Sequence, residues 1–234
     1  FFKSKEIKNF YVFQGGAIMN IIHQLGSDKS LKYLVPHHEQ SLSMMVDTAA
    51  RISGYGVGMV TSGPGATNIL TGVCSAYYDS IPCFFITGQV GQIHIKKNKN
   101  YRQLGFQETD VVSIFKSVTK YAAQIKNTSE VQGQLEKAYQ LSLQGRPGPV
   151  LLDVPFNIQN QKIKIKKSIR IPSKKRSKKN KLNYTYIKNT INKLGKCVKD
   201  SNKILFVIGG GIKNSKVKKR LINFLNKKKL PFSL

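Results

Sequence analysis

The chain has 234 residues, a net charge of +28 and 40% hydrophobic residues. That length and apolar content suffice for one or two folded domains with real cores, which excludes wholesale disorder. The longest apolar runs, such as residues 83–86 and 204–208, are far too short to cross a bilayer, and no secretory signal core begins the chain, so we expect a cytoplasmic protein without membrane partners.

Along the first two thirds of the chain, apolar strand-like runs alternate with helical patterns. The predicted strands are residues 10–13, 33–35, 58–61, 83–87, 150–154 and 204–208. The predicted helices are residues 17–24, 40–52, 66–78 and 130–143. This alternation is typical of an α/β fold, a parallel sheet flanked by helices.

Two of these elements carry specific packing predictions. In helix 40–52 the residues that recur at helical spacing, and should therefore face the sheet, are Leu42, Met45, Val46, Ala49 and Ile52. Strand 33–35 is expected to be buried. Strand 150–154 is continuously apolar except for Asp153, as expected of a strand buried on both faces.

The composition changes sharply after residue 158. We predict a first domain over residues 1–160, a basic linker over 161–181, and an incomplete second α/β domain over 182–234. Two strands and two helices cannot bury both faces of a sheet, and the chain lacks an initiator Met. We therefore expect it to be part of a longer protein.

The positive charge is concentrated in the last third. Residues 1–160 hold 15 Lys and Arg against 10 Asp and Glu, whereas residues 161–181 hold 11 basic residues and no acidic one. A basic nucleic-acid-binding protein is one interpretation of this pattern. No aromatic side chain interleaves residues 162–181 to stack on bases, which favours a solvated linker.

The three cysteines, Cys74, Cys83 and Cys197, are odd in number and widely spaced. They form neither a metal-ligand pattern nor a disulfide framework. We predict reduced thiols packed in apolar surroundings, and no metal site.

Two strand-to-helix junctions carry the candidate chemistry. His37-His38-Glu39-Gln40 places one carboxylate after the strand 33–35, where open α/β sheets bind ligands. Some twenty residues later, the segment 61–68 is a glycine-rich turn that is neither a Walker nor a Rossmann motif. Gly63 and Gly65 allow close backbone approach to a ligand. Taken alone, Glu39 is a helix-start carboxylate that stabilises the helix dipole.

In this order and spacing, the two motifs resemble the N-terminal pyrimidine-binding domain of thiamine-diphosphate enzymes, especially the large subunit of acetolactate synthase and its relatives. The resemblance covers residues 11–155 and resumes at 203–211. It implies the thiamine-diphosphate-binding fold and thiamine diphosphate as cofactor. It also implies that a C-terminal domain holds the diphosphate and Mg²⁺ through a Gly-Asp-Gly run, which this sequence lacks.

The resemblance assigns roles to particular residues. Glu39 is catalytic: it hydrogen-bonds a ring nitrogen of the aminopyrimidine and acts across a dimer interface. The other residues expected beside the cofactor are Gly15, Gly16, Gly63, Pro64 and Asn68. His38 is a secondary candidate for proton handling, because neighbouring side chains of an extended segment point in opposite directions and only one of His37 and His38 can face the pocket.

The same resemblance places Phe106, Gln107 and Lys120 at the substrate pocket, with Gln107 donating to substrate oxygens and Phe106 forming a wall. Arg146, Gly209, Gly210 and Gly211 match positions that contact FAD in acetolactate synthases. Whether FAD is retained stays open. The prolines and glycines around Arg146 also describe a rigid helix-to-strand turn.

The implied activity is a carboligase that joins the two-carbon unit of pyruvate to a second 2-oxo acid, the acetolactate synthesis of branched-chain amino acid biosynthesis. The implied assembly is a homodimer or homotetramer, with a regulatory subunit as a further expected partner. An alternative comes from residues 101–108, whose Arg-Gln-Leu-Gly run is similar to acetolactate-synthase-like proteins of surface-sugar modification. Some of those transfer the acetyl unit to a nucleotide-linked keto sugar. A third hypothesis is a degenerate or regulatory paralogue that retains the fold without the activity.

Overall fold

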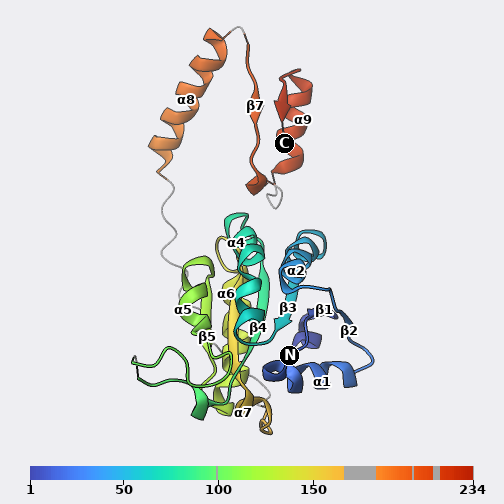
Figure 1. Ribbon diagram of the computed structural model, residues 1–234. Coiled ribbons are helices and arrows are strands. Elements are labelled where there is room, and N and C mark those ends of the chain that lie inside the picture. The colour runs from blue at the N-terminus through green and yellow to red at the C-terminus, as the bar shows by residue number, and fades with distance from the viewer. Residues whose placement is uncertain (99, 166–182, 202, 213–216, 234) are drawn as a thin grey trace. The chain divides into compact units, whose positions relative to one another are not determined.

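The computed structural model describes residues 1–98, 100–165, 183–201, 203–212 and 217–233 (Figure 1). It divides into two compact units, residues 1–171 and 172–234, which are described separately below. Most of the predicted linker 161–181 lies outside the described residues, and the predicted domain limits stay predictions. Among the helices in the described ranges, none combines the length and the hydropathy needed to cross a membrane.

The first unit is built on a parallel sheet. Its six strands are β1 (Asn9–Val12), β2 (Lys32–Leu34), β3 (Gly56–Val60), β4 (Cys83–Gln89), β5 (Tyr121–Gln124) and β6 (Val150–Pro155). They lie in the order β2-β1-β3-β4-β6-β5, and every pairing is parallel. The central strands β3 and β4 are buried along their whole length, because helices cover both faces.

Helices flank the sheet on both faces, which confirms the predicted α/β class (Figure 1). One face is covered by α1 (Met19–Ser27), α6 (Val131–Leu143) and α7 (Phe156–Gln159), and the other by α2 (Glu39–Ser53), α3 (Pro64–Asn68), α4 (Leu70–Tyr78) and α5 (Val111–Phe115). Short 3-10 helices occupy Phe2–Lys5, Gly16–Ile18, Gln92–His94, Lys116–Val118 and Thr128–Glu130. The hydrophobic core beneath α1, α6 and α7 contains Phe10 and Leu152. The core on the other face of the sheet contains Leu42 and Phe85.

The predicted inner stripe of α2 was wrong in part. Leu42 and Val46 are buried, whereas Met45 and Ile52 are exposed. The buried stripe continues instead through polar residues, because α2 packs against α4 as well as β3: the Asp47 carboxylate accepts hydrogen bonds from Ser75 of α4 and from Arg51. Polar side chains that have hydrogen-bond partners can be buried as well. The buried face of α2 is therefore displaced by about one residue from the apolar stripe.

The prediction that strand 33–35 is buried was wrong. β2 is an edge strand that pairs only with β1, so Tyr33 and Leu34 are exposed. Helix 66–78 is in fact two helices, α3 and α4, which meet at Ile69. The strand β5 and the helix α5 were not predicted, because both are short and β5 has only half-buried residues.

The second unit contains α8 (Tyr184–Asp200), β7 (Phe206–Val207), α9 (Lys218–Lys227) and β8 (Phe232–Ser233), with a 3-10 helix at Gly210–Ile212. β7 and β8 pair in parallel. Cys197 lies on α8, which has no buried residue, so the prediction of packed thiols is wrong for Cys197. Cys83 is buried in the first unit, and burial raises the pKa of its thiol.

Candidate functional site

The carboxyl ends of β1, β2, β3 and β4 meet at one edge of the sheet, because all pairings are parallel. Gly15 and Gly16 follow β1, Glu39 begins α2 after β2, and the turn of residues 61–65 follows β3. The loop of residues 90–109, which carries Phe106 and Gln107, follows β4. The two motifs that are separate in the sequence therefore share this carboxyl edge.

Glu39 is a buried carboxylate at this edge, with 8% of its surface exposed. Its Oε2 accepts a hydrogen bond from the Asn68 side-chain amide at 3.0 Å. Among the described residues, Oε1 accepts no hydrogen bond, and it lies beside Gly65, where an added Cβ would be 3.5 Å from it. Asn68 therefore orients the carboxylate, and Oε1 is the oxygen that remains without a hydrogen bond from this part of the structure.

His38 caps the helix that Glu39 begins. Its Nδ1 accepts a hydrogen bond from the backbone N–H of Gln40 at 3.1 Å, so in the neutral ring the proton sits on Nε2. That Nε2 lies 3.9 Å from Glu39 Oε2 and 3.5 Å from the Asn68 amide nitrogen. His38 thus lies beside Glu39 in space as well as in sequence, on the side of the oxygen that Asn68 already holds.

Thr61 is a residue of this edge that the sequence analysis did not single out. An added Cβ at Gly15 would lie 2.4 Å from Thr61 Cβ, and one at Gly65 would lie 2.7 Å from Thr61 Cγ2. The Thr61 hydroxyl also accepts a hydrogen bond from the backbone N–H of Ala17 at 3.3 Å. Both glycines are therefore required by close packing around a single threonine side chain.

Gly63 allows the turn after β3 to pack directly against Gln107 of the loop of residues 90–109. Its φ of 59° and ψ of −121° are accessible almost only to glycine, and an added Cβ would lie 2.8 Å from Gln107 Cβ and 2.9 Å from Gln107 O. Gln107 itself has a φ of 61°, which is uncommon for a residue with a side chain. Pro64 follows at the start of α3, where its fixed φ is favourable.

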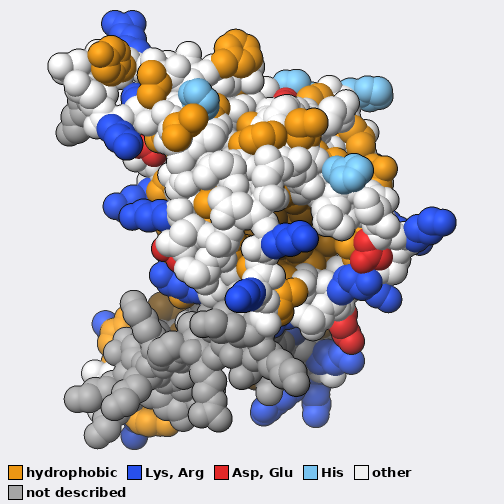
Figure 2. All heavy atoms as spheres, turned by 90° about the horizontal axis from the view of Figure 1, so that it is seen from below, with side chains coloured by type: hydrophobic (Ala, Val, Ile, Leu, Met, Phe, Trp, Pro, Cys, Tyr) orange, Lys and Arg blue, Asp and Glu red, His pale blue; other side chains and the backbone are white. Residues whose placement is uncertain are grey.

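Glu108 braces the loop that carries Gln107. Its two carboxylate oxygens accept hydrogen bonds from the backbone N–H groups of Lys96 (3.0 Å) and Leu104 (2.7 Å). Phe106 in the same loop is 85% exposed. The hydrophobic side chains exposed near the carboxyl edge also include Met19, Leu34, Val35, Ile93 and Leu104. Figure 2 shows hydrophobic and histidine side chains gathered on one part of the visible face.

Lys120 and Arg146 lie at the opposite, amino-terminal edge of the sheet, directly before β5 and shortly before β6. The Lys120 ammonium donates to the Gln144 carbonyl, and burial lowers its pKa. The Arg146 guanidinium donates to Ser80 Oγ (2.5 Å) and to the Tyr78 carbonyl (3.0 Å). Within a single chain, the structure therefore does not bring Lys120 together with Phe106 and Gln107.

Gly209, Gly210 and Gly211 follow β7 in the second unit. A Cβ added at any of them would meet no atom within 4 Å. Among the described residues, no atom therefore blocks the approach of another group to their backbone.

A buried polar network lies on the strands beside the site. Asp153 of β6 is fully buried, and its carboxylate accepts hydrogen bonds from Thr87 (2.7 Å), Gln124 (2.8 Å) and Gln89 (3.1 Å). Burial outweighs these hydrogen bonds and raises the pKa of Asp153 from 3.8 to about 6. In the sequence, the polar residues Thr87 and Gln89 at the end of the apolar run of β4 indicate this network.

We expect Asp153→Asn to remove a pH-dependent loss of stability. Because the folded-state pKa is raised, the folded chain binds this proton more tightly than the unfolded chain, and the resulting stabilisation disappears as pH rises toward and through about 6. The free energy of unfolding of the wild type should fall by about 2 kcal/mol from this group between about pH 4.5 and 7. Urea unfolding of both proteins at the two pH values measures it, and an identical pH dependence would contradict the assignment.

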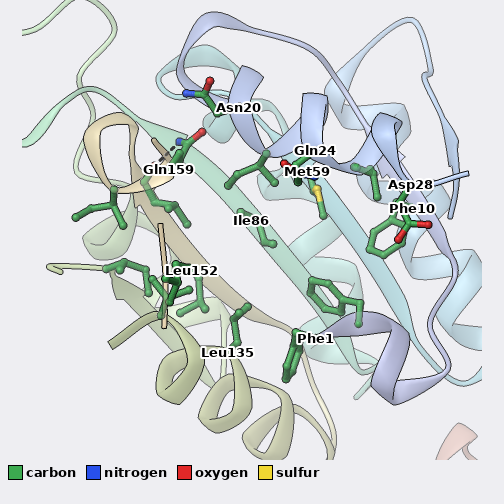
Figure 3. A pocket seen from close by; sticks show the side chains of 18 of the residues that line it. Phe1, Phe10, Asn20, Gln24, Asp28, Met59, Ile86, Leu135, Leu152 and Gln159 are labelled. Atoms are coloured by element: carbon green, nitrogen blue, oxygen red, sulfur yellow. Dashed lines mark hydrogen bonds between the residues drawn. The ribbon is translucent and has the colours of Figure 1, made fainter. Parts of the chain in front are cut away.

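A mostly apolar cavity lies away from the carboxyl edge of the sheet. It has a volume of about 570 Å³ and lies on the face covered by α1 and α6 (Figure 3). Phe10, Met59, Ile86 and Leu152 lie along its floor, and none of the predicted site residues lines it. Among the residues that the structure describes, no group of three or more His, Cys, Asp and Glu side chains could hold a metal ion.

Comparison with known proteins identifies the class of this fold and site. Residues 1–114 match the thiamine pyrophosphate enzyme, N-terminal TPP binding domain. The chain is 39% identical over 155 residues to the acetolactate synthase isozyme 3 large subunit of Escherichia coli, covering 66% of the chain and 26% of that protein. It is 33% identical over 230 residues to the probable acetolactate synthase large subunit of Methanocaldococcus jannaschii, covering 98% of the chain and 38% of that protein.

A third relative is the mitochondrial acetolactate synthase catalytic subunit of Saccharomyces cerevisiae, 32% identical over 230 residues, which cover 95% of the chain and 32% of that protein. The chain thus spans about a quarter to two fifths of the length of these curated relatives. It belongs to the thiamine-diphosphate-dependent, acetolactate-synthase-like family.

Proposed function

We propose that this chain supplies the pyrimidine-binding part of a carboligase that joins the two-carbon unit of pyruvate to a second 2-oxo acid, as in acetolactate synthesis. The observation that carries the proposal is the Glu39 carboxylate, which is buried at the carboxyl edge with Oε2 held by Asn68, while Oε1 lies beside Gly65 and accepts no hydrogen bond from the described residues. A merely structural carboxylate would be expected to use both oxygens, as Glu108 does.

These residues fit the aminopyrimidine of thiamine diphosphate. When bound, the cofactor supplies the carbanion chemistry that decarboxylates a 2-oxo acid. Glu39 Oε1 would hydrogen-bond a ring nitrogen and hold the exchanging proton there, while Asn68 fixes the carboxylate rotamer. Gly15 and Gly65 pack closely against Thr61, and Gly63 packs against Gln107, so these contacts hold the turns after β1 and β3 together beside Glu39.

The substrate side of the proposal rests on the loop of residues 90–109. Gln107 would donate its amide to substrate oxygens, and Phe106 would shield the reacting group from water. Lys120 joins this pocket only if another copy of the chain contributes it. A homodimer or homotetramer would cover the exposed hydrophobic side chains at the carboxyl edge, including Leu34, Val35 and Phe106.

The relatives are named large or catalytic subunits, which supports a regulatory subunit as a partner. FAD would contact Gly209, Gly210 and Gly211, whose surroundings are open, while the Arg146 guanidinium already has protein partners. Among the described residues, no cluster of three or more His, Cys, Asp and Glu side chains could bind Mg²⁺. We propose a cytoplasmic location.

The proposed function is tested by incubating the full-length protein with thiamine diphosphate, Mg²⁺ and pyruvate alone. We expect acetolactate to accumulate, because the second pyruvate serves as the acceptor. Consumption of pyruvate only after a nucleotide-linked keto sugar is added would contradict the proposed acceptor. Failure to consume pyruvate with either acceptor would contradict the proposed activity as a whole.

A further inference from the structure

Gln89, the last residue of β4, joins the sheet to both ends of the loop of residues 90–109. Its side chain is buried, with 1% exposed. Its amide nitrogen donates to the Thr109 carbonyl at 2.8 Å and to Asp153 Oδ2 at 3.1 Å. Its amide oxygen accepts from the backbone N–H of Val90 at 3.0 Å. Val90 begins the loop and Thr109 ends it, so a single side chain closes the loop.

Asp153 determines how the Gln89 amide is turned. Asp153 pairs in register with Thr87 of β4 and Gln124 of β5, which places the three side chains in one row on the same face of the sheet. Since the Asp153 carboxylate only accepts hydrogen bonds when ionised, it requires the nitrogen of Gln89 on its side. The oxygen of Gln89 is then left for Val90.

The loop needs such an anchor because Gln107 has an unfavourable backbone conformation. A φ of 61° is unfavourable for a residue with a side chain, and it persists only where the surroundings enforce it. The bonds of Glu108 to Lys96 and Leu104 hold the loop to itself rather than to the sheet. The bond from Gln89 to Thr109 ties it to β4 just two residues after Gln107.

We propose that Gln89, oriented by Asp153, is a positioning residue that holds the loop of residues 90–109 so that Gln107 stays against Gly63. The consequence for turnover rests on the proposed function, whereas the anchoring of the loop does not. The comparisons and the motifs assign no role to either residue.

The chain offers a matched pair of variants for the test. Gln89 and Gln124 both donate to Asp153 Oδ2, but only Gln89 also bonds the loop. In hydrogen–deuterium exchange on the purified chain, Gln89→Met should accelerate exchange of the Val90, Leu104 and Glu108 amides at least about tenfold. Gln124→Met should leave them within about twofold of wild type. Equal acceleration in both variants would overturn the proposal.

A second measurement uses the full-length enzyme with thiamine diphosphate. Gln89→Met should lower kcat for pyruvate about tenfold at unchanged affinity for the cofactor, whereas Gln124→Met should not. Faster loop exchange in Gln89→Met with unchanged kcat would overturn the positioning role. If the wild type consumes no pyruvate, the proposed function fails, and the exchange comparison still decides the anchoring. Should Gln89→Met not fold, Gln89→Glu retains the volume and the acceptor for Val90, but its carboxyl group has at most one donor and cannot bond both Asp153 and Thr109, so faster exchange of the Leu104 and Glu108 amides is again expected.

Discussion

Replacing Glu39 by Gln should reduce turnover of the full-length enzyme by about 10²- to 10⁴-fold while leaving the fold intact. Gln keeps the shape of the side chain and can still accept the bond from Asn68, but it cannot hold an exchanging proton on Oε1. The direct measurement is the rate of exchange of the thiazolium C2 proton at saturating thiamine diphosphate. We expect this rate to fall together with turnover, and the free energy of unfolding to change by less than about 1 kcal/mol.

Glu108→Gln is the matched control, because Glu108 is equally buried at 8% exposure and lies at the same edge. Both of its oxygens accept backbone N–H groups, so an amide must present its NH₂ to one of these donors. We expect a loss of stability of about 1–3 kcal/mol and little change in C2 exchange. If Glu39→Gln left C2 exchange unchanged, Glu39 would have no catalytic role, and the proposed function would lose its main support.

Gly63→Ala should destabilise the chain by about 2–4 kcal/mol and displace Gln107. Two effects add at this position. A side chain at φ 59° and ψ −121° strains the backbone, and the new Cβ would lie 2.8 Å and 2.9 Å from the Cβ and the carbonyl oxygen of Gln107. The second contact is with backbone, which cannot rotate away as a flexible side chain does. Urea unfolding measures the loss of stability.

Gly145→Ala separates these two effects. Gly145 also has a positive φ, of 65°, but a Cβ there would meet no atom within 4 Å. Its substitution should therefore cost only the backbone term, about 1 kcal/mol. A loss in Gly63→Ala no larger than that in Gly145→Ala would contradict both the contact with Gln107 and the additional strain at ψ −121°.

Much of the architecture could be predicted because it depends on local patterns. Short apolar runs separated by helical periods indicated a parallel sheet, and five of its six strands lie where they were expected. The predictions failed where a neighbouring element changes the environment of a residue. Strand 33–35 is apolar yet exposed, because it has only one sheet neighbour. The inner face of α2 is turned toward α4, so that Asp47 is buried in place of Ile52.

The amino-acid sequence by itself determined that one carboxylate, Glu39, stands where a strand gives way to a helix, followed by a glycine-rich turn. Only the tertiary structure decided which groups surround it. Asn68 reaches Glu39 across 29 residues, and the Gln107 backbone fills the space that Gly63 leaves. Lys120 lies at the opposite edge of the sheet. Such contacts depend on strand order and register, and no local periodicity encodes them, because they join residues that are distant along the chain.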